Sequence, residues 1–316
     1  MSIMDRKIER VAIVGTGVIG ASWAAYFLAR GLRVQATDPA PDAGARLAAA
    51  VDRLWPTMER IGLQEGASRD RLSFFPDMQD ALFEADFVQE NGPENEEFKI
   101  ELFRQMDACT PPDVVLATSS SGLLVSRVQS ACVHPERVVL GHPFNPPHLI
   151  ALVEVLGGQQ TSPEAVQSTM DFYRSIGKRP INPRKEVKGH IANRLQAALW
   201  REAFHLVDQG VASVEDIDIA ISHGPGLRWA LLGPFLNLHL SGGQGGIEHL
   251  LDHLGGPIET WWDDLGSPSM TPELKQKVAE GVREVLARYP DDEFVPERDR
   301  LLVDLVVEKA KAPKLP

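Results

Sequence analysis

The chain has 316 residues, of which 43% are hydrophobic, more than a disordered or fibrous polymer carries. Its 44 acidic residues outnumber its 32 basic ones, and the net charge of −12 argues against a nucleic-acid or anionic-lipid partner. The two cysteines, Cys109 and Cys132, form neither a disulfide framework nor a metal-ligand cluster. No apolar run reaches the roughly 18 residues of a membrane span, and residues 1–10 lack the apolar segment of a signal peptide. We expect a cytoplasmic protein with no metal.

A strand, a tight turn and a helix are predicted at the start of the chain. Residues 11–14 read Val-Ala-Ile-Val, typical of a buried strand, and a glycine-rich turn leads into an Ala-rich helix that Gly31 ends. Residues 33–37 form a second strand ending at Asp38, with prolines after it. A βαβ unit is therefore complete at Asp38.

Further strand patterns alternate with helical ones along the first half of the chain. They fall at residues 72–75, 86–90, 114–118, 138–141, 152–156 and 179–182. Alternation of this kind is typical of a parallel sheet. We predict an α/β fold with a Rossmann-type doubly wound sheet over residues 1–184.

Helical periodicity replaces the strand signals from about residue 185, which predicts an all-α C-terminal domain over residues 185–316. Glycine-rich breaks at residues 224–226, 242–246 and 255–256 are interpreted as turns between helices. Residues 297–316 alternate charge with Leu and Val, which predicts a terminal amphipathic helix. Apolar helices such as residues 229–240 need a surface to cover them, so we expect a homodimer.

The glycine-rich turn has the pattern of a dinucleotide site, G-x-G-x-x-G between a strand and a helix. Asp38 lies about 20 residues downstream at the end of the second strand, where a carboxylate binds ribose hydroxyls and repels a 2′-phosphate. We predict NAD in preference to NADP; the alternative is a turn without function and an Asp38 that caps the next turn. The expected cofactor contacts in the turn are Gly15, Gly17, Val18, Ile19 and Gly20.

Two polar clusters follow strands at their carboxyl ends, where open α/β sheets bind ligands. Residues 118–122 read Thr-Ser-Ser-Ser-Gly, and residues 141–147 read Gly-His-Pro-Phe-Asn-Pro-Pro. Hydride transfer from an alcohol to NAD leaves a hydroxyl proton to be taken up, and the neutral imidazole of His142 suits that task. Glu154 is the candidate carboxylate for the other ring nitrogen. The alternative is a turn histidine and a surface carboxylate.

With these motifs the chain resembles the 3-hydroxyacyl-CoA dehydrogenase superfamily, within it the short branch of L-gulonate 3-dehydrogenases (lambda-crystallins) and L-carnitine dehydrogenases. The family's His-x-x-Asn-Pro, Leu-Val-Glu and Asn-Arg-Leu motifs appear at residues 142–146, 152–154 and 193–195. The likeness covers nearly the whole chain. It implies that His142 is the catalytic base and Glu154 its partner.

The resemblance also implies roles for five further residues. Ser121 and Asn193 would position the substrate oxygen, whereas Glu94, Lys99 and Asn145 would contact the cofactor. From the residues alone, Ser119 and Ser120 can donate the same hydrogen bond as Ser121, and Asn193 can be a helix-start residue. Glu94 and Lys99 can equally be a first-turn carboxylate and an exposed helical lysine.

The charges favour a free acid over a CoA thioester. Residues 39–70, where CoA-using relatives place a lysine-rich tail, contain no lysine and mix arginines with carboxylates. Residues 226–235 carry Arg228 where the CoA enzymes have a short turn without arginine, and both short relatives have Gly-x-Arg-aromatic-Ala there. A guanidinium binds a carboxylate through two hydrogen bonds, so Arg228 is our hypothesis for the substrate carboxylate site; the alternative is a surface arginine.

The tryptophans of the second half do not decide which group the rest of the substrate carries. Trp229, and further on Trp261 and Trp262, can pack in a core or an interface, or they can face a trimethylammonium group such as that of carnitine. A polyhydroxy acid such as gulonate would need polar side chains. We expect Trp229 to bind the substrate together with Arg228.

We therefore expect an NAD-dependent dehydrogenase that reversibly oxidises the 3-hydroxy group of a small free L-3-hydroxy acid of the carnitine or gulonate type. One alternative is a 3-hydroxybutyryl-CoA dehydrogenase. A more distant one is a crystallin-like structural protein that binds NAD without a catalytic role. A lactate-type 2-hydroxy acid dehydrogenase would need an arginine loop that we do not find.

Overall fold

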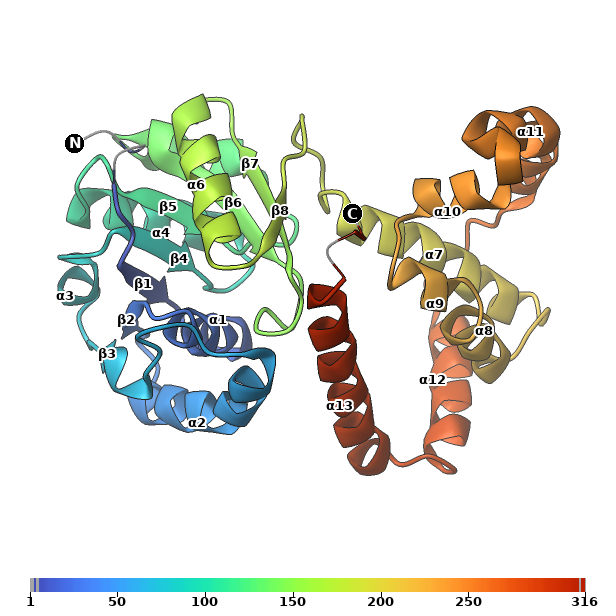
Figure 1. The fold of residues 1–316 in the computed structure, drawn as a ribbon, viewed down its shortest axis with the longest axis horizontal. Coiled ribbons are helices and arrows are strands. Elements are labelled where there is room, and N and C mark those ends of the chain that lie inside the picture. Colours follow the sequence, from blue (N-terminus) through green and yellow to red (C-terminus); the bar gives the residue numbers. More distant parts are fainter. Residues whose placement is uncertain (1–2, 4–5, 313, 316) are drawn as a thin grey trace. The chain divides into compact units, whose positions relative to one another are not determined.

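The computed structural model describes residues 3, 6–312 and 314–315. The chain divides into two compact units, Met1–Arg194 and Leu195–Pro316, and each is described by itself (Figure 1). Helix α7 (Ala192–Asp208) begins in the first unit and continues into the second. Among the described residues, no helix is long and apolar enough to cross a membrane.

The first unit is built on one eight-stranded sheet in the order β3-β2-β1-β4-β5-β6-β7-β8. The strands are β1 (Arg10–Val14), β2 (Arg33–Thr37), β3 (Leu72–Phe74), β4 (Phe87–Glu90), β5 (Val115–Thr118), β6 (Val138–Pro143), β7 (Leu152–Gly157) and β8 (Arg179–Ile181). The order reverses beside β1, as in a doubly wound sheet, so the predicted fold class is confirmed. The predicted strands all form, with shifts of one or two residues at their ends.

One pairing differs from the prediction of a parallel sheet. Strand β6 pairs antiparallel with β7, whereas β7 and β8 are parallel to each other. The connection of residues 144–151 explains the difference, because a parallel crossover needs a dozen or more residues. The chain therefore turns back directly along β6.

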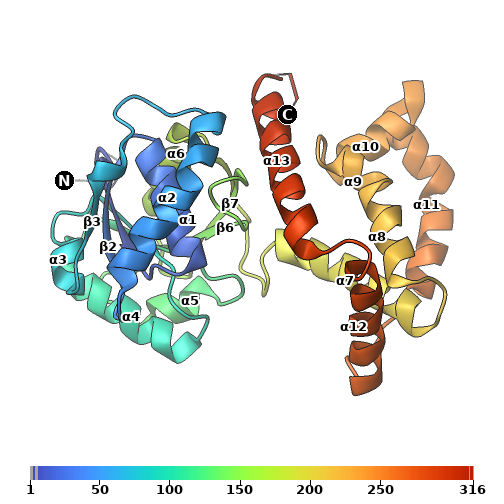
Figure 2. The ribbon, with the colours of Figure 1, turned by 90° about the horizontal axis from the view of Figure 1, so that it is seen from below.

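Helices cover both faces of this sheet (Figure 2). One core joins the sheet to α1, α2 and α6, and a second core joins its other face to α3, α4 and α5. The helices are α1 (Val18–Ala29), α2 (Ala43–Ile61), α3 (Met78–Leu82), α4 (Glu96–Cys109), α5 (Val125–Val128) and α6 (Pro163–Ser175), with short 3-10 turns at Arg69–Arg71, Gln129–Ala131 and Pro135–Arg137. Both faces are buried, which explains the continuous apolar runs in the strands.

The second unit is helical, as predicted. Its elements after α7 are α8 (Val214–Ser222), α9 (Pro225–Trp229), α10 (Pro234–Ser241), a 3-10 turn (Gly243–Gly245), α11 (Gly246–Asp264), α12 (Pro272–Leu286) and α13 (Asp291–Ala310). Two of the predicted glycine breaks fall at the junctions of α8 with α9 and of α10 with α11, although Gly226 and Gly246 already belong to the following helices. The terminal helix forms but begins earlier than predicted.

The third predicted break was wrong. Gly255 and Gly256 lie inside α11, which continues through Pro257. Neither glycine has a positive φ. Because Gly256 has no Cβ, it avoids much of the clash that a proline imposes on the preceding helical residue. The pair therefore accommodates the proline and does not end the helix.

Candidate active site

The glycine turn between β1 and α1 leaves room for a phosphate group. Gly15 has φ +88°, and a Cβ on Gly20 would lie 2.0 Å from the Gly15 carbonyl oxygen, so side chains are excluded at both positions. Gly17 is the N-cap of α1, has open space where a Cβ would stand, and leaves the helix without a side-chain cap. An uncapped helix N-terminus beside open space fits a pyrophosphate. Val18 and Ile19 lie in the first turn of that helix.

Asp38 follows β2 and is held beside this turn. One oxygen accepts hydrogen bonds from the amide and hydroxyl of Thr16 at 2.7 and 3.1 Å, and the other accepts from the amide of Ala40. Burial alone would raise the pKa of Asp38, but these bonds and the nearby Arg46 together lower it. The group is therefore a carboxylate at neutral pH, which suits ribose hydroxyls and disfavours a 2′-phosphate.

His142 and Glu154 face each other across β6 and β7, because the antiparallel register makes them direct partners. The Nδ1 atom of His142 donates to the Oε2 atom of Glu154 at 2.9 Å. Both side chains are buried. Since Nδ1 carries the proton, Nε2 of the neutral ring keeps a lone pair for accepting a substrate proton.

The other oxygen of Glu154 is bound at the start of α7. Oε1 accepts hydrogen bonds from the amides of Ile191 at 2.8 Å and Ala192 at 3.1 Å. Burial would raise the pKa of Glu154, but the bond from His142 and the two amides outweigh it and lower the pKa. Glu154 is therefore ionised and stabilises positive charge on His142 when the ring takes a proton.

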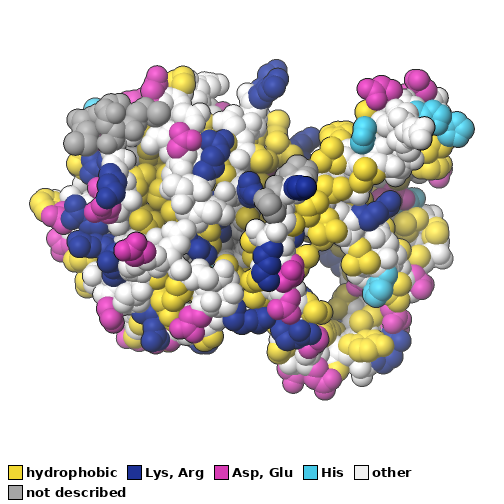
Figure 3. All heavy atoms as spheres, in the orientation of Figure 1, with side chains coloured by type: hydrophobic (Ala, Val, Ile, Leu, Met, Phe, Trp, Pro, Cys, Tyr) yellow, Lys and Arg dark blue, Asp and Glu magenta, His cyan; other side chains and the backbone are white. Residues whose placement is uncertain are grey.

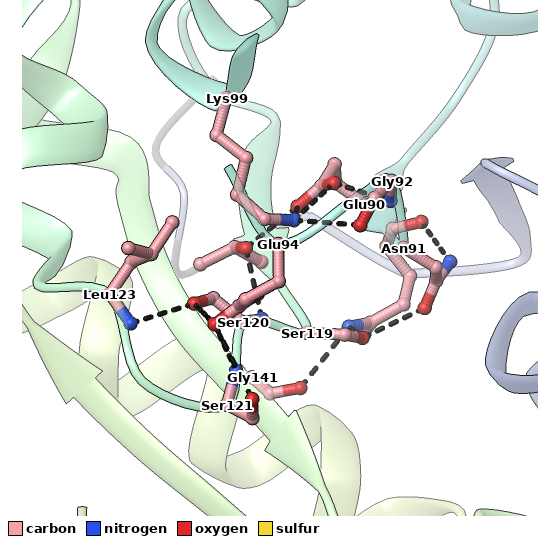
Figure 4. A network of polar contacts seen from close by, with 12 residues as sticks. Glu90, Asn91, Gly92, Glu94, Lys99, Ser119, Ser120, Ser121, Leu123 and Gly141 are labelled. Carbon is pink, nitrogen blue, oxygen red and sulfur yellow. Dashed lines mark hydrogen bonds and ion pairs between the residues drawn. The ribbon is translucent and has the colours of Figure 1, made fainter. Parts of the chain in front are cut away.

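The loop of residues 119–122, here called the serine loop, is held by Glu94 (Figure 4). The Oε1 atom of Glu94 accepts hydrogen bonds from the Ser120 hydroxyl at 2.7 Å and from the amides of Ser121 and Gly122 at 3.0 and 2.9 Å. Glu94 lies just before α4, and the serine loop follows β5. The carboxylate thus fixes the backbone of a loop that sits at the carboxyl ends of the strands.

The three serines differ in how far their hydroxyls are already used. Ser119 donates to Asn91 and accepts from Gln89, both at 2.8 Å. Ser120 donates to Glu94 and accepts from the amide of Leu123. The hydroxyl of Ser121 is exposed and has only a long contact of 3.4 Å with Glu94. Ser121 is therefore the serine whose hydroxyl is most available to a ligand.

Asn193 and Asn145 approach the same region from two segments. Asn193, in the first turn of α7, donates from Nδ2 to the Ser121 carbonyl at 3.2 Å. Asn145 is exposed in the turn after β6, where its peptide bond to Pro146 is cis. This turn is tied to α1, since Ser22 accepts from the amide of His148 at 2.9 Å.

Lys99 is not the exposed helical lysine that one interpretation of the sequence allows. Its Nζ atom lies 2.6 and 2.8 Å from the two carboxylate oxygens of Glu90 and donates to the Gly92 carbonyl at 3.2 Å (Figure 4). Lys99 is 1% exposed and Glu90 is fully buried. The amine is thus engaged inside the first unit.

Arg228 and Trp229 lie at the end of α9 in the second unit. Both are exposed, and within the described residues the Arg228 guanidinium has no ion-pair partner. The ring contacts of the described part do not join Trp229 to Trp261 or Trp262, which lie near the end of α11.

Two groups near His142 were missed by the sequence analysis. Gln89 donates to the Gly141 carbonyl at 3.1 Å and accepts from the hydroxyl of Tyr173, so it supports the strand residue before His142. His190 packs its ring 5.3 Å from the ring of His142. Their proximity to the site arises only in the folded chain, and neither residue stands in a recognisable motif.

Both units match known family profiles. Residues 10–187 match the profile described as "3-hydroxyacyl-CoA dehydrogenase, NAD binding domain", and residues 189–285 match "3-hydroxyacyl-CoA dehydrogenase, C-terminal domain". An L-carnitine dehydrogenase of Streptomyces coelicolor is 49% identical over 95% of this chain and 94% of its own length. One of Bacillus cereus is 46% identical over 95% of this chain and 92% of its own.

Two solved structures of dehydrogenases are similar to this chain. A 5-formyl-3-hydroxy-2-methylpyridine 4-carboxylic acid 5-dehydrogenase, described as an NAD+-dependent dismutase, has a TM-score of 0.82 at 31% identity over 96% of this chain and 99% of its own. A 3-hydroxybutyryl-CoA dehydrogenase of Escherichia coli has a TM-score of 0.65 at 32% identity over 74% of this chain and 49% of its own. This chain therefore belongs to the 3-hydroxyacyl-CoA dehydrogenase family and is an NAD-dependent oxidoreductase.

Proposed function

We propose that this enzyme reversibly oxidises the 3-hydroxyl group of L-carnitine, a small free L-3-hydroxy acid, to the 3-keto acid. The single observation that carries the proposal is the likeness to L-carnitine dehydrogenases over nearly the whole chain. The His142–Glu154 pair supports the chemistry, because it provides a base that acts on any secondary alcohol. The substrate class rests on the likeness, and the reaction type rests on the pair.

The residues of the first unit have distinct tasks in this proposal. Nε2 of His142 takes the hydroxyl proton, and Glu154 stabilises the imidazolium that forms. Ser121 and Asn193 hold the substrate oxygen, which develops carbonyl character. NAD, when bound, accepts the hydride from the carbon that carries the hydroxyl group.

The cofactor contacts are proposed at the glycine turn and at the strand ends. The turn of residues 15–20 takes the pyrophosphate and Asp38 takes the adenine ribose. Glu94 and Asn145 line the nicotinamide end in this proposal. Lys99 acts there through Glu90 and Gly92, since its amine is already bound to both.

The carboxylate of the substrate is assigned to Arg228. A guanidinium without an ion-pair partner among the described residues is free to bind a carboxylate through two hydrogen bonds. The indole of Trp229 offers an aromatic face to the trimethylammonium group. L-gulonate has no cation to make this cation–π contact, which favours carnitine.

The enzyme should be tested with NAD against L-carnitine, L-gulonate, 3-hydroxybutyrate and 3-hydroxybutyryl-CoA, in wild type and in R228M. We expect the highest kcat/KM for L-carnitine, and for R228M a KM raised about 10- to 100-fold with kcat little changed, because the guanidinium binds a group remote from the reaction. R228K is the control that keeps the charge and loses the two-point geometry. A preference for the thioester, or an unchanged KM in R228M, would overturn this assignment.

We also propose that residues 1–184 bind NAD, that residues 185–316 contribute substrate contacts, and that two copies associate through the second part. The support is the amount of apolar surface that this part leaves uncovered. Phe235, Leu240, Trp261 and Trp262 are each more than 60% exposed, and Figure 3 shows apolar side chains gathered on one face of the helical unit. Patches of that kind mark association surfaces.

A further inference from the structure

His190 is a buried histidine beside the catalytic pair that has no role so far. It lies in the turn before α7, where its amide donates to the Val187 carbonyl at 3.1 Å. Its φ of +50° follows a Gly189 with φ +75°, so the backbone is bent sharply at this point. The side chain is only 2% exposed. A buried polar ring at such a bend needs partners, and the partners show what it does.

The proton on the His190 ring can be assigned from its contact with the serine loop. Nε2 lies 3.2 Å from the Ser120 carbonyl oxygen. Because a carbonyl only accepts, Nε2 carries the proton, and in the neutral ring Nδ1 is left as an acceptor. Nδ1 is buried and has no hydrogen-bond partner in the described structure. The ring is thus bound on one side only.

The same ring packs against His142. The two ring centroids are 5.3 Å apart, with the planes tilted by 47°. Burial lowers the pKa of His190, and the nearby His142 lowers it further, against smaller opposing effects of the Ser120 carbonyl, Glu154 and Glu94. The lowered pKa favours the neutral form of His190 beside the ring that takes the substrate proton in the proposed reaction. Two adjacent charged rings are avoided.

The serine loop is consequently held from two sides. Glu94 accepts from the amides of Ser121 and Gly122, as described above. On the other side, two donors bind successive carbonyls, His190 that of Ser120 and Asn193 that of Ser121. Because His190 also contacts the His142 ring, it touches both the loop with the Ser121 hydroxyl and the base.

We propose that His190 is a positioning residue for the dehydrogenase reaction, which sets the Ser121 hydroxyl relative to His142 by binding the Ser120 carbonyl and packing on the His142 ring. This inference rests on the proposed function, in which Ser121 and His142 act on one substrate hydroxyl. A shift of about 1 Å in such a pair can lower the rate about 100-fold without a loss of folding.

The test compares three substitutions of the same residue with the best substrate of the panel above. H190Q keeps an amide donor near the position of Nε2, H190F keeps the ring without a donor, and H190N keeps an amide that ends one bond too early. We expect kcat to fall about 10- to 100-fold in H190F and H190N, with KM for NAD unchanged, and to recover in H190Q to within about threefold of wild type.

Matched controls use His134, a partly exposed histidine of the first unit whose Nδ1 lies near Glu136. H134Q and H134F should leave kcat unchanged. A purely structural role would lower kcat in H190Q and H190F alike, in proportion to the loss of Tm, and that result would overturn the inference. So would an H190F and an H190N with wild-type kcat. If wild type oxidises none of the four substrates, the proposed function fails instead.

Discussion

The two units differ most in how completely they bury their apolar side chains. In the first unit, strands and helices form two continuous cores on either side of the sheet, with residues such as Phe27, Phe87 and Phe103 fully buried. In the second unit, the buried large apolar residues among those described are only Val207, Leu250, Leu274 and Val303. The first unit therefore has an extensive core of its own, whereas the second leaves more of its large apolar side chains exposed.

The same contrast applies to polar groups. The first unit buries several pairs of ionisable side chains, among them Glu154 with His142, Glu90 with Lys99 and Asp107 with Arg137. The ion pairs of the second unit are mostly at its surface, where each contributes little. The charges of these three pairs are therefore held inside the first unit, whereas the charged groups of the second unit are mostly exposed.

The largest expected effect comes from H142A, which tests whether the chemistry resides in the first unit. Loss of the base should lower kcat by about two to four orders of magnitude, because the imidazole that takes the proton and that Glu154 orients is removed. NAD affinity, measured by titration of cofactor fluorescence, should remain that of wild type, since the dinucleotide turn is untouched. Turnover in H142A above about a tenth of the wild-type rate would contradict the assignment.

The sequence was sufficient for the fold class and for the order of elements in the first unit, because its strands are short apolar runs between clear helix patterns. The antiparallel turn back from β6 to β7 departs from the parallel sheet that the strand and helix alternation predicts. Yet that turn creates the pair at the site, since only an antiparallel register sets His142 opposite Glu154. The motifs therefore predicted that His142 and Glu154 act together, although they did not predict how the two strands pair.

Contacts between distant segments could not be predicted. His190 reaches the serine loop across 70 positions in the sequence, and Tyr173 reaches Gln89 across 84. Local periodicity carries no information on such pairs, because they depend on how α6 and the start of α7 dock against the sheet. In the second unit, the helix pattern across Gly255 and Gly256 was misjudged because a glycine before a proline can relieve strain as well as end a helix.

A smaller effect, on stability, is expected from K99M. Removing the amine leaves the carboxylate of Glu90 buried with only the Thr118 hydroxyl and the Gly92 amide as donors. We expect a loss of about 3–5 kcal/mol in the free energy of unfolding of the first unit, measured by urea denaturation. The second unit offers no comparable buried pair among its described residues, so only the first should be weakened.

The double variant E90Q/K99M is the control for this prediction. It removes both charges, and we expect it to regain much of the lost stability, because a buried neutral amide costs less than a buried unpaired carboxylate. Because Lys99 acts on the cofactor site only through Glu90 and Gly92, NAD affinity should change by less than about tenfold in either variant. A K99M protein with wild-type stability and NAD binding weakened more than tenfold would instead make Lys99 a direct cofactor contact.

The smallest expected effect tests the exposed surface of the second unit with two phenylalanines that are equally accessible. Phe235 in α10 is 77% exposed and Phe83, just after α3 in the first unit, is 73% exposed. If α10 lies in a dimer interface, F235D should raise the dimer dissociation constant about 10- to 100-fold, because an aspartate would be buried without a partner. F83D should leave it unchanged. Sedimentation over a concentration series distinguishes these outcomes. An equal change of the dimer dissociation constant in both variants would contradict an interface at α10, because any exposed phenylalanine would then give the same result.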